Sequence, residues 1–250
     1  MSIRVGYIPY LNMAPFHQGF GPAPLEIEGQ RFEFHSMSPR VLGLEAEKGT
    51  IDAGALSLVD GLKLSETFEP LGPFGIGLKR PALSVLLFSK KPISELQGLC
   101  AVTDETSTSF RLLRVLLEVR YAHQSMKYGR IASSMLFDGE ADALLLIGDE
   151  ALKAKKEGIR GLPIVTDLGE EWYSWQASPF VFARWSVRKS IRSEVKALIL
   201  KLIQNSLYSN RKGTSEELEY WNGFSYKLTP AHERSISKFQ ELLIQRNSYV

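Results

Sequence analysis

Residues 178–187, "SPFVFARWSV", and the earlier run "LSVLLFSK" at residues 83–90 decide the fold. Both runs are apolar enough to be buried strands, and the segment between them has strand and helix patterns of its own. This arrangement favours an α/β chain of two lobes, with the two runs as crossing strands. We expect a first lobe of residues 1–87 and 184–250, which includes the C-terminal helices, and an inserted second lobe of residues 88–183. A single doubly wound domain with a helical tail is a nearly equal alternative.

The rest of the chain supports an α/β class. Short apolar runs alternate with segments of helical period over the first two thirds, the pattern of parallel strands joined by crossover helices. A helix over residues 39–48 follows Ser38, begins with proline and ends before Gly49. After residue 188 the apolar stripes predict helices and no further strands. The expected strands are residues 4–8, 51–58, 83–90, 99–104, 141–148 and 179–187.

Composition and charge exclude several classes of protein. The 30 basic and 28 acidic residues give a net charge of +2 without a long block of one sign, which is not typical of a nucleic-acid binder. The single Cys100 excludes an internal disulfide, and the four histidines show no spacing typical of metal ligands. No export leader precedes the first strand, and no apolar stretch approaches the roughly 20 residues that span a bilayer. We therefore expect a cytoplasmic protein without nucleic-acid or membrane partners.

Polar residues gather where the predicted strands end. Asn12 follows the first strand, Ser57 ends the second and Ser84 opens the third. The run Thr106–Ser109 follows the strand at residues 99–104 and opens a helix, whose free N–H groups and dipole suit a carboxylate. Each of these residues alone is also explained as a helix cap or a turn former, and Asn12 is either such a turn residue or an amide directed into a pocket. Their joint occurrence favours a ligand crevice between the lobes.

Strong catalytic groups are scarce in this sequence. The histidines lie in different elements without a paired carboxylate, and no glycine-rich nucleotide motif is present. Asp149 and Glu150 fit the first turn of a helix, where they complement its dipole. Trp172 and Trp175 have the spacing of a packed helical turn. Any chemistry must therefore need little from acids, bases or metals.

Four stretches carry a family resemblance: "RVGYIPYLNMAPF" (residues 4–16), "LSVLLFSK", "ALLLIGDEAL" (143–152) and "DLGEEWYSWQASPFVFARWSVR" (167–188). Together with "LEYWNGFSYKLTPAHERSISKF" (218–239) they resemble the chorismate dehydratase family of the futalosine route to menaquinone. The resemblance implies a two-lobed type II periplasmic-binding-protein fold with two crossing strands. It also implies a cytoplasmic hydro-lyase, without metal or cofactor, that converts the dianion chorismate to 3-[(1-carboxyvinyl)oxy]benzoate and water.

The resemblance also implies roles for particular residues. Asn12, in the "YLN" motif, would orient the ring and donate to the leaving hydroxyl, and Ser84 would bond the same region. No protein base can be named, and the substrate's own enolpyruvyl carboxylate is the expected base. The substrate-binding residues implied are Ser57, Ser107, Thr108, Ser109, Ile147 and Gly148.

The sequence leaves alternatives open for the substrate and for the function. Gln176–Pro179 stands where members of the family usually have Thr-Gly-Leu-Pro, so a shifted substrate preference is one consequence. A sibling enzyme of the same fold, 1,4-dihydroxy-6-naphthoate synthase, uses a histidine near residues 144–150, where this chain has none. A non-catalytic protein of the same fold that binds small carboxylates is the alternative from another class.

Overall fold

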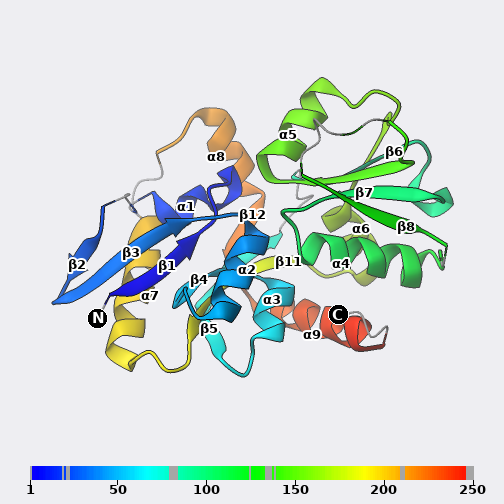
Figure 1. The fold of residues 1–250 in the computed structure, drawn as a ribbon. Coiled ribbons are helices and arrows are strands. Elements are labelled where there is room, and N and C mark those ends of the chain that lie inside the picture. The colour runs from blue at the N-terminus through cyan, green and yellow to red at the C-terminus, as the bar shows by residue number, and fades with distance from the viewer. Residues whose placement is uncertain are drawn as a thin grey trace. The chain divides into compact units, whose positions relative to one another are not determined.

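The computed structural model describes residues 2–18, 20, 23–78, 84–123, 125–132, 137, 139–208 and 212–245. The chain folds into two compact units, each built on a mixed β-sheet covered by helices (Figure 1). Unit 1 comprises Met1–Gly77 and Val181–Thr229, and unit 2 comprises Leu78–Phe180 and Pro230–Val250. The chain therefore passes between the units three times.

The sheet of unit 1 has the strand order β12-β5-β11-β4-β1-β3-β2. Strand β1 lies parallel to both β3 and β4, whereas β11 runs antiparallel to β4 and β5. The strands are β1 (Ile3–Tyr7), β2 (Leu25–Ile27), β3 (Gln30–Ser36), β4 (Ala53–Ser57), β5 (Phe68–Leu78), β11 (Val181–Arg188) and β12 (Phe224–Lys227). The helices are η1 (Leu11–Met13), α1 (Ala14–His17), α2 (Pro39–Lys48), α3 (Leu58–Lys63), α7 (Ser193–Tyr208) and α8 (Ser215–Asn222).

Helix α2 confirms the predicted helix over residues 39–48. Pro39 occupies its first turn, where a missing N–H costs nothing. The helix ends at Gly49, whose φ of 83° is left-handed and whose N–H bonds the carbonyl of Ala46. Its apolar side, with Leu42 and Ala46 buried, packs on β4.

The sheet of unit 2 has the strand order β10-β6-β9-β7-β8. Strand β7 lies parallel to β8 and β9, whereas β6 runs antiparallel to β9 and β10. The strands are β6 (Val85–Ser89), β7 (Leu99–Thr103), β8 (Lys127–Ile131), β9 (Ala143–Ile147) and β10 (Ile164–Asp167). The helices are η2 (Ile93–Glu95), α4 (Thr108–Val115) with the π-helical extension η3 (Leu116–Arg120), α5 (Gly148–Glu157), α6 (Leu168–Gln176) and α9 (Pro230–Gln245).

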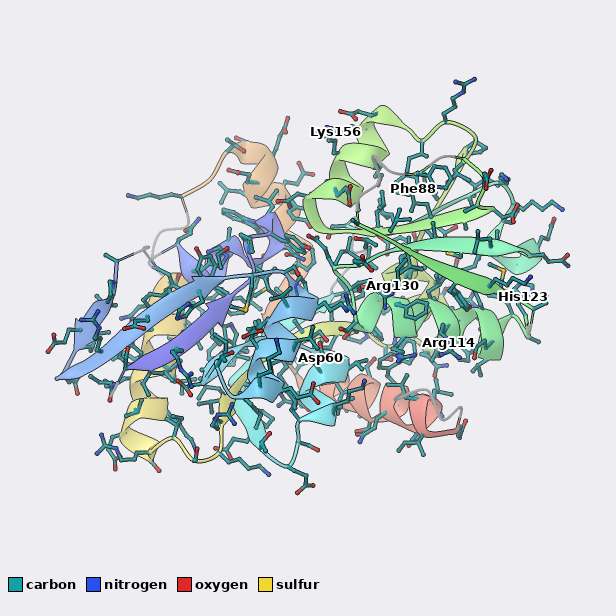
Figure 2. All side chains as sticks on the ribbon, viewed as in Figure 1. Asp60, Phe88, Arg114, His123, Arg130 and Lys156 are labelled. Carbon is teal, nitrogen blue, oxygen red and sulfur yellow. The ribbon has the colours of Figure 1, made fainter. Side chains whose placement is uncertain are left out.

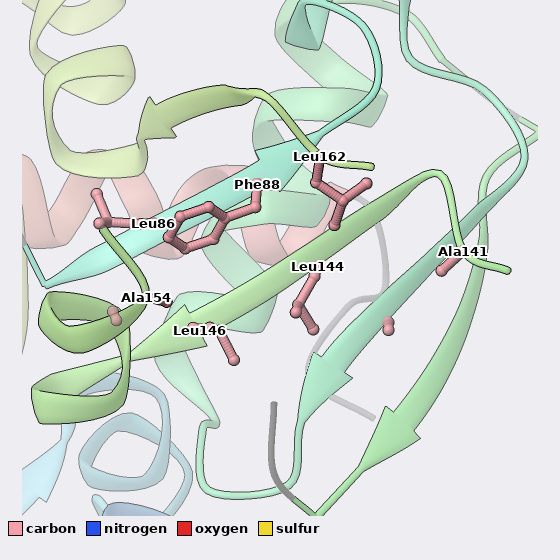
Figure 3. Close-up of a cluster of buried hydrophobic side chains, with 9 residues drawn as sticks. Leu86, Phe88, Ala141, Leu144, Leu146, Ala154 and Leu162 are labelled. Carbon is pink, nitrogen blue, oxygen red and sulfur yellow. The ribbon is translucent and has the colours of Figure 1, made fainter. Parts of the chain in front are cut away.

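The core of unit 2 follows from strand alternation. Leu86 and Phe88 of β6 and Leu144 and Leu146 of β9 point to one face of the sheet, where they form a cluster with residues of α5 (Figure 3). The residues between them, such as Leu145, are also fully buried and point to the other face. Both faces are therefore covered, which explains why these strands read as continuous apolar runs.

The sequence misses several strands, of which β5, β8 and β12 matter most here, and it misplaces one crossing. Strand β5 was not expected, because Pro70, Pro73 and three glycines interrupt its apolar pattern. Strand β12 contradicts the prediction that strands stop after residue 188. The sequence places the first crossing at residues 83–90, but the chain leaves unit 1 after Gly77, and β6 lies inside the sheet of unit 2. The six expected strands are present as β1, β4, β6, β7, β9 and β11.

The last helix also lies elsewhere than expected. The sequence assigns residues 184–250 to the first lobe, whereas α9 belongs to unit 2. The indole Nε1 of Trp172 on α6 donates to Ser235 Oγ of α9 at 2.9 Å. Phe239 packs edge-on against Trp172 and against Phe180, with ring centroids 5.7 and 5.0 Å apart. An apolar stripe predicts that a terminal helix is buried, but it does not say on which unit.

Replacing Ser235 by alanine is expected to lower the free energy of unfolding by about 1–3 kcal/mol, because it leaves the buried indole N–H of Trp172 without an acceptor. Urea denaturation measures this change. Ser237→Ala is the matched control, since Ser237 is exposed on the same helix and bonds only the carbonyl of Glu233 among the contacts described. Equal stabilities of the two variants would contradict the proposed contribution of the hydrogen bond between Trp172 and Ser235.

Within the described part of the chain, no helix combines the length and apolar character required to cross a membrane.

Candidate functional site

Two of the predicted site residues lie at one edge of the unit 1 sheet. Strands β1 and β4 are parallel neighbours, with Val5 opposite Ala53. Asn12 follows the carboxyl end of β1, and Ser57 is the last residue of β4. The loops at the carboxyl ends of parallel strands are where α/β folds commonly bind ligands.

The amide oxygen of Asn12 takes no part in its own turn. The 3-10 turn that holds it is closed by the backbone, with the N–H of Met13 donating to the carbonyl of Tyr10 at 2.9 Å. Asn12 Oδ1 is buried, and among the described residues no group donates a hydrogen bond to it. A buried acceptor without a donor costs about 1–3 kcal/mol, so such an atom needs an explanation. Of the two alternatives for Asn12, a turn residue or an amide directed into a pocket, this geometry favours the second.

The turn around Asn12 is held from several sides within unit 1. Trp221 of α8 donates its indole N–H to the carbonyl of Leu11 at 2.7 Å. His17 Nε2 lies 3.1 Å from the carbonyl of Ile8, and burial lowers the pKa of its ring. His17 is therefore a neutral structural residue at pH 7, as the sequence suggested for the histidines.

Ser57 caps helix α3. Its Oγ accepts from the N–H of Asp60 at 3.3 Å and donates to Asp60 Oδ2 at 2.7 Å. Asp60 in turn lies against Gly43 of α2, where an added Cβ would come within 2.6 Å of the Asp60 Cγ (Figure 2). The capping alternative therefore describes Ser57 in this structure, and its contact with a substrate stays a prediction.

The remaining predicted residues lie together at one edge of the unit 2 sheet. Strands β7 and β9 are parallel neighbours; α5 begins directly after β9, and α4 begins after the short loop that follows β7. Ser84 reaches the same edge because it precedes β6, which runs antiparallel to β9 with Val85 opposite Ile147. The N–H of Gly148 donates to the carbonyl of Ser84 at 2.8 Å, and the φ of Gly148 is 61°, a value that favours glycine. The residues that share this edge are Ser84, Ser107, Thr108, Ser109, Ile147 and Gly148.

The two helix starts at this edge differ in charge. The first turn of α5 holds Asp149 and Glu150, whereas that of α4 holds no acidic residue. Thr106 Oγ1 accepts from the N–H of Ser109 at 3.2 Å, so the cap is supplied by the buried Thr106. An anionic ligand is therefore better accommodated at α4, because the carboxylates of α5 repel it.

Arg130 is a residue of this edge that sequence reasoning missed. It lies at the carboxyl end of β8, and its Nη1 donates to the carbonyls of Thr103 and Thr106 at 2.9 and 3.1 Å. Its guanidinium also lies over the ring of Phe110, 4.8 Å from the centroid (Figure 2). Arg130 thereby fixes the loop between β7 and α4. Only the strand β8, which the sequence did not predict, brings it there.

The described residues offer no group of three or more His, Cys, Asp or Glu side chains able to hold a metal ion. Burial raises the pKa of the Cys100 thiol to about 12, which keeps it an unreactive part of the core. His123 Nε2 lies 3.0 Å from the carbonyl of Ile93. Each unit therefore keeps one candidate ligand position, at the polar edge of its own sheet.

Comparisons with known proteins place the chain in a family. A family profile described as menaquinone biosynthesis matches residues 3–245. A chorismate dehydratase from Thermus thermophilus is 30% identical over 211 residues, which cover 79% of this chain and 74% of that protein.

Solved structures show the same fold. Protein AF1704 from Archaeoglobus fulgidus superposes with a TM-score of 0.71 at 18% identity and covers 98% of each chain. The ligand-binding component of an ABC-type import system from Staphylococcus aureus superposes with a TM-score of 0.60 at 11% identity, covering 99% of this chain and 92% of that one. These matches confirm the predicted α/β fold of the periplasmic-binding-protein-like type.

Proposed function

The chain belongs to the menaquinone biosynthesis family, and on that premise we propose that it is a chorismate dehydratase, a hydro-lyase that forms 3-[(1-carboxyvinyl)oxy]benzoate and water. The observation that carries the proposal is the buried Oδ1 of Asn12, which accepts no hydrogen bond from the described residues. A buried acceptor without a donor destabilises the free protein, so its presence supports a ligand that donates a hydrogen bond to it. The ring hydroxyl of chorismate is such a donor. The cytoplasmic location implied by the resemblance is part of this proposal.

The proposed reaction depends more on the orientation of the bound substrate than on strong acids or bases. The hydrogen at ring C3 and the hydroxyl at C4 leave, and the ring becomes aromatic, which drives the reaction. Because the C3–H bond is vinylogous to the ring carboxylate, a fixed positive field at that carboxylate stabilises the developing negative charge. We assign this seat to the start of α4, where Thr106, Thr108 and Ser109 are buried and the first turn carries no acidic residue.

Asn12 is assigned to the leaving group. Its Oδ1 can accept from the ring hydroxyl and so fix the C4 oxygen, and its amide N–H is a donor for the hydroxide as it departs. Ser84 is assigned to the same region. Nε2 of His17 and Nε2 of His123 each lie at hydrogen-bond distance from a backbone carbonyl, and we keep the enolpyruvyl carboxylate of the substrate as the proposed base.

Incubation of the purified protein with chorismate tests the proposal. We expect ultraviolet absorbance of the aromatic product to grow in proportion to protein concentration, with the product identified by mass spectrometry. A rise in melting temperature with chorismate and no product would instead support a non-catalytic carboxylate-binding protein of the same fold. If the protein gives no product and shows no melting shift with chorismate, then chorismate is excluded as the ligand.

A further inference from the structure

We propose that Trp221 is a positioning residue for Asn12, so that helix α8 sets the orientation of the amide that binds the leaving hydroxyl. The catalytic part of this inference rests on the proposed function. All the contacts that carry it lie within unit 1. The C-terminal motif "LEYWNGFSY" that contains Trp221 has no other role in the proposed reaction.

The amide of Asn12 cannot hold its own direction. Its Oδ1 has no donor among the described residues, so no hydrogen bond to this oxygen fixes the side chain. The backbone of the turn then contributes to the direction of the side chain. The peptide that enters Asn12 is the one whose carbonyl belongs to Leu11, and that carbonyl is the acceptor of the Trp221 indole. A rotation of this peptide would break the indole bond and swing the amide away.

Helix α8 is itself firmly placed beside this turn. Thr214 and Glu217 form a complete capping box at its start, with the Thr214 N–H donating to Glu217 Oε2 at 2.7 Å. Trp221 is only 2% exposed. Its ring packs on Gly213, where an added Cβ would come within 2.8 Å of the ring carbons. The donor is therefore fixed before any ligand arrives.

A pair of hydrogen bonds between Gln18 and Lys212 also joins the chain around Asn12 to the chain around α8. Gln18 Nε2 donates to the carbonyl of Lys212 at 2.7 Å, and the N–H of Lys212 donates back to Gln18 Oε1 at 3.3 Å. Residues 11–18 are thus tied at both ends, Leu11 to Trp221 of α8 and Gln18 to Lys212 in the segment before α8. Helix α8 contacts η1, the turn that carries Asn12, and Figure 1 shows α8 in this part of unit 1.

Trp221→Phe removes the indole donor and keeps most of the ring packing. We expect kcat for chorismate to fall by about 10- to 100-fold, with KM changed much less, because small misplacements of a reacting contact cost this much. In an Asn12→Ala background the same substitution is expected to cause no further fall in kcat, since there is no amide left to position. An unchanged kcat, or an equal fall in both backgrounds, would overturn the proposal.

Trp172→Phe is the matched control. It removes another buried indole N–H, which donates to Ser235 in unit 2, and so lowers the melting temperature to a similar extent without lowering kcat. If Trp221→Phe does not fold, Gln18→Ala is measured in the same two backgrounds, with the same pattern expected and the same outcomes overturning the proposal. Gln18 is exposed, which makes that variant safe for folding.

A measurement without substrate separates this inference from the proposed function. In a ¹⁵N spectrum, the side-chain amide signals of Asn12 are identified by their loss in Asn12→Ala. We expect these signals to shift or broaden in Trp221→Phe and to stay in place in Trp172→Phe. Unchanged signals would refute positioning, whereas absent turnover of chorismate by the unmodified protein would refute the function alone.

Discussion

Asn12→Ala is expected to lower kcat for chorismate by about 10²- to 10³-fold, the loss seen when one donor to a developing oxyanion is removed. The same substitution is expected to leave the melting temperature unchanged or to raise it. It deletes a buried oxygen that accepts no hydrogen bond among the described residues, and burying such an atom destabilises the fold. Activity and stability therefore move in opposite directions, which a residue that merely shapes a turn would not produce.

Steady-state kinetics and thermal unfolding of the same preparations measure both effects. Asn205→Ala is the control, because it makes the same chemical change at an exposed position of α7. It should leave kcat unaltered. Near-normal turnover by Asn12→Ala would reduce Asn12 to a turn residue. A clear drop in its melting temperature would show that the amide supports the free protein.

The sequence predicts the strands whose apolar runs are continuous and misses those whose pattern is interrupted. Strands such as β6 and β9 are buried on both faces, so every residue in them is apolar or nearly so and the run is plain. Strand β5 is equally buried at its end, but its prolines and glycines hide it. Short strands such as β12, with four residues, are too brief for any periodicity to appear.

The candidate site follows the same division. Asn12 and the Thr and Ser residues before α4 could be predicted because polar residues directly after buried strands are local signals. Arg130 and Trp221 could not, because each acts on a backbone carbonyl that is distant in sequence: Trp221 lies 210 positions from its acceptor Leu11. The family resemblance rests on the motif of Leu11 and on the motif of Trp221, but it does not reveal the hydrogen bond between these two residues. Ser57 could be located from the sequence, but its role could not, because a serine that caps a helix and a serine that binds a ligand look alike in sequence.

Asp52 is expected to be the most important single charge for the stability of unit 1. It lies before the amino end of β4, at the opposite edge of the sheet from Asn12. Its carboxylate accepts from Arg4 Nη2 at 2.8 Å and from Arg4 Nε at 2.9 Å, and the Arg4 backbone N–H adds a third bond at 3.0 Å. The guanidinium of Arg188 is 3.9 Å away and also bonds the carbonyls of Ala46 and Ile51.

Asp52→Asn is expected to lower the free energy of unfolding by about 3 kcal/mol, because it leaves two guanidinium groups facing a neutral amide. Burial by itself raises the pKa of Asp52, but the hydrogen bonds from Arg4 and the charges of both arginines outweigh it, so the pKa lies below its ordinary value. The stabilisation is therefore fully present above a pH of about 4 and is lost as the pH falls through the folded-state pKa. Urea denaturation at several pH values should show the gap between the unmodified protein and the variant closing on acidification.

Glu45→Gln provides the control for this measurement, since Glu45 pairs with Lys48 on the surface of α2, where solvent screens the pair and its contribution to stability is small. A gap that widens on acidification would contradict the assignment of the low pKa to Asp52. Because Asp52 lies at the edge away from Asn12, Asp52→Asn should also keep kcat close to that of the unmodified protein. Asp52→Asn thus loses stability and keeps turnover, whereas Asn12→Ala loses turnover and keeps stability, and this reciprocal pair locates the reaction at the carboxyl ends of the strands.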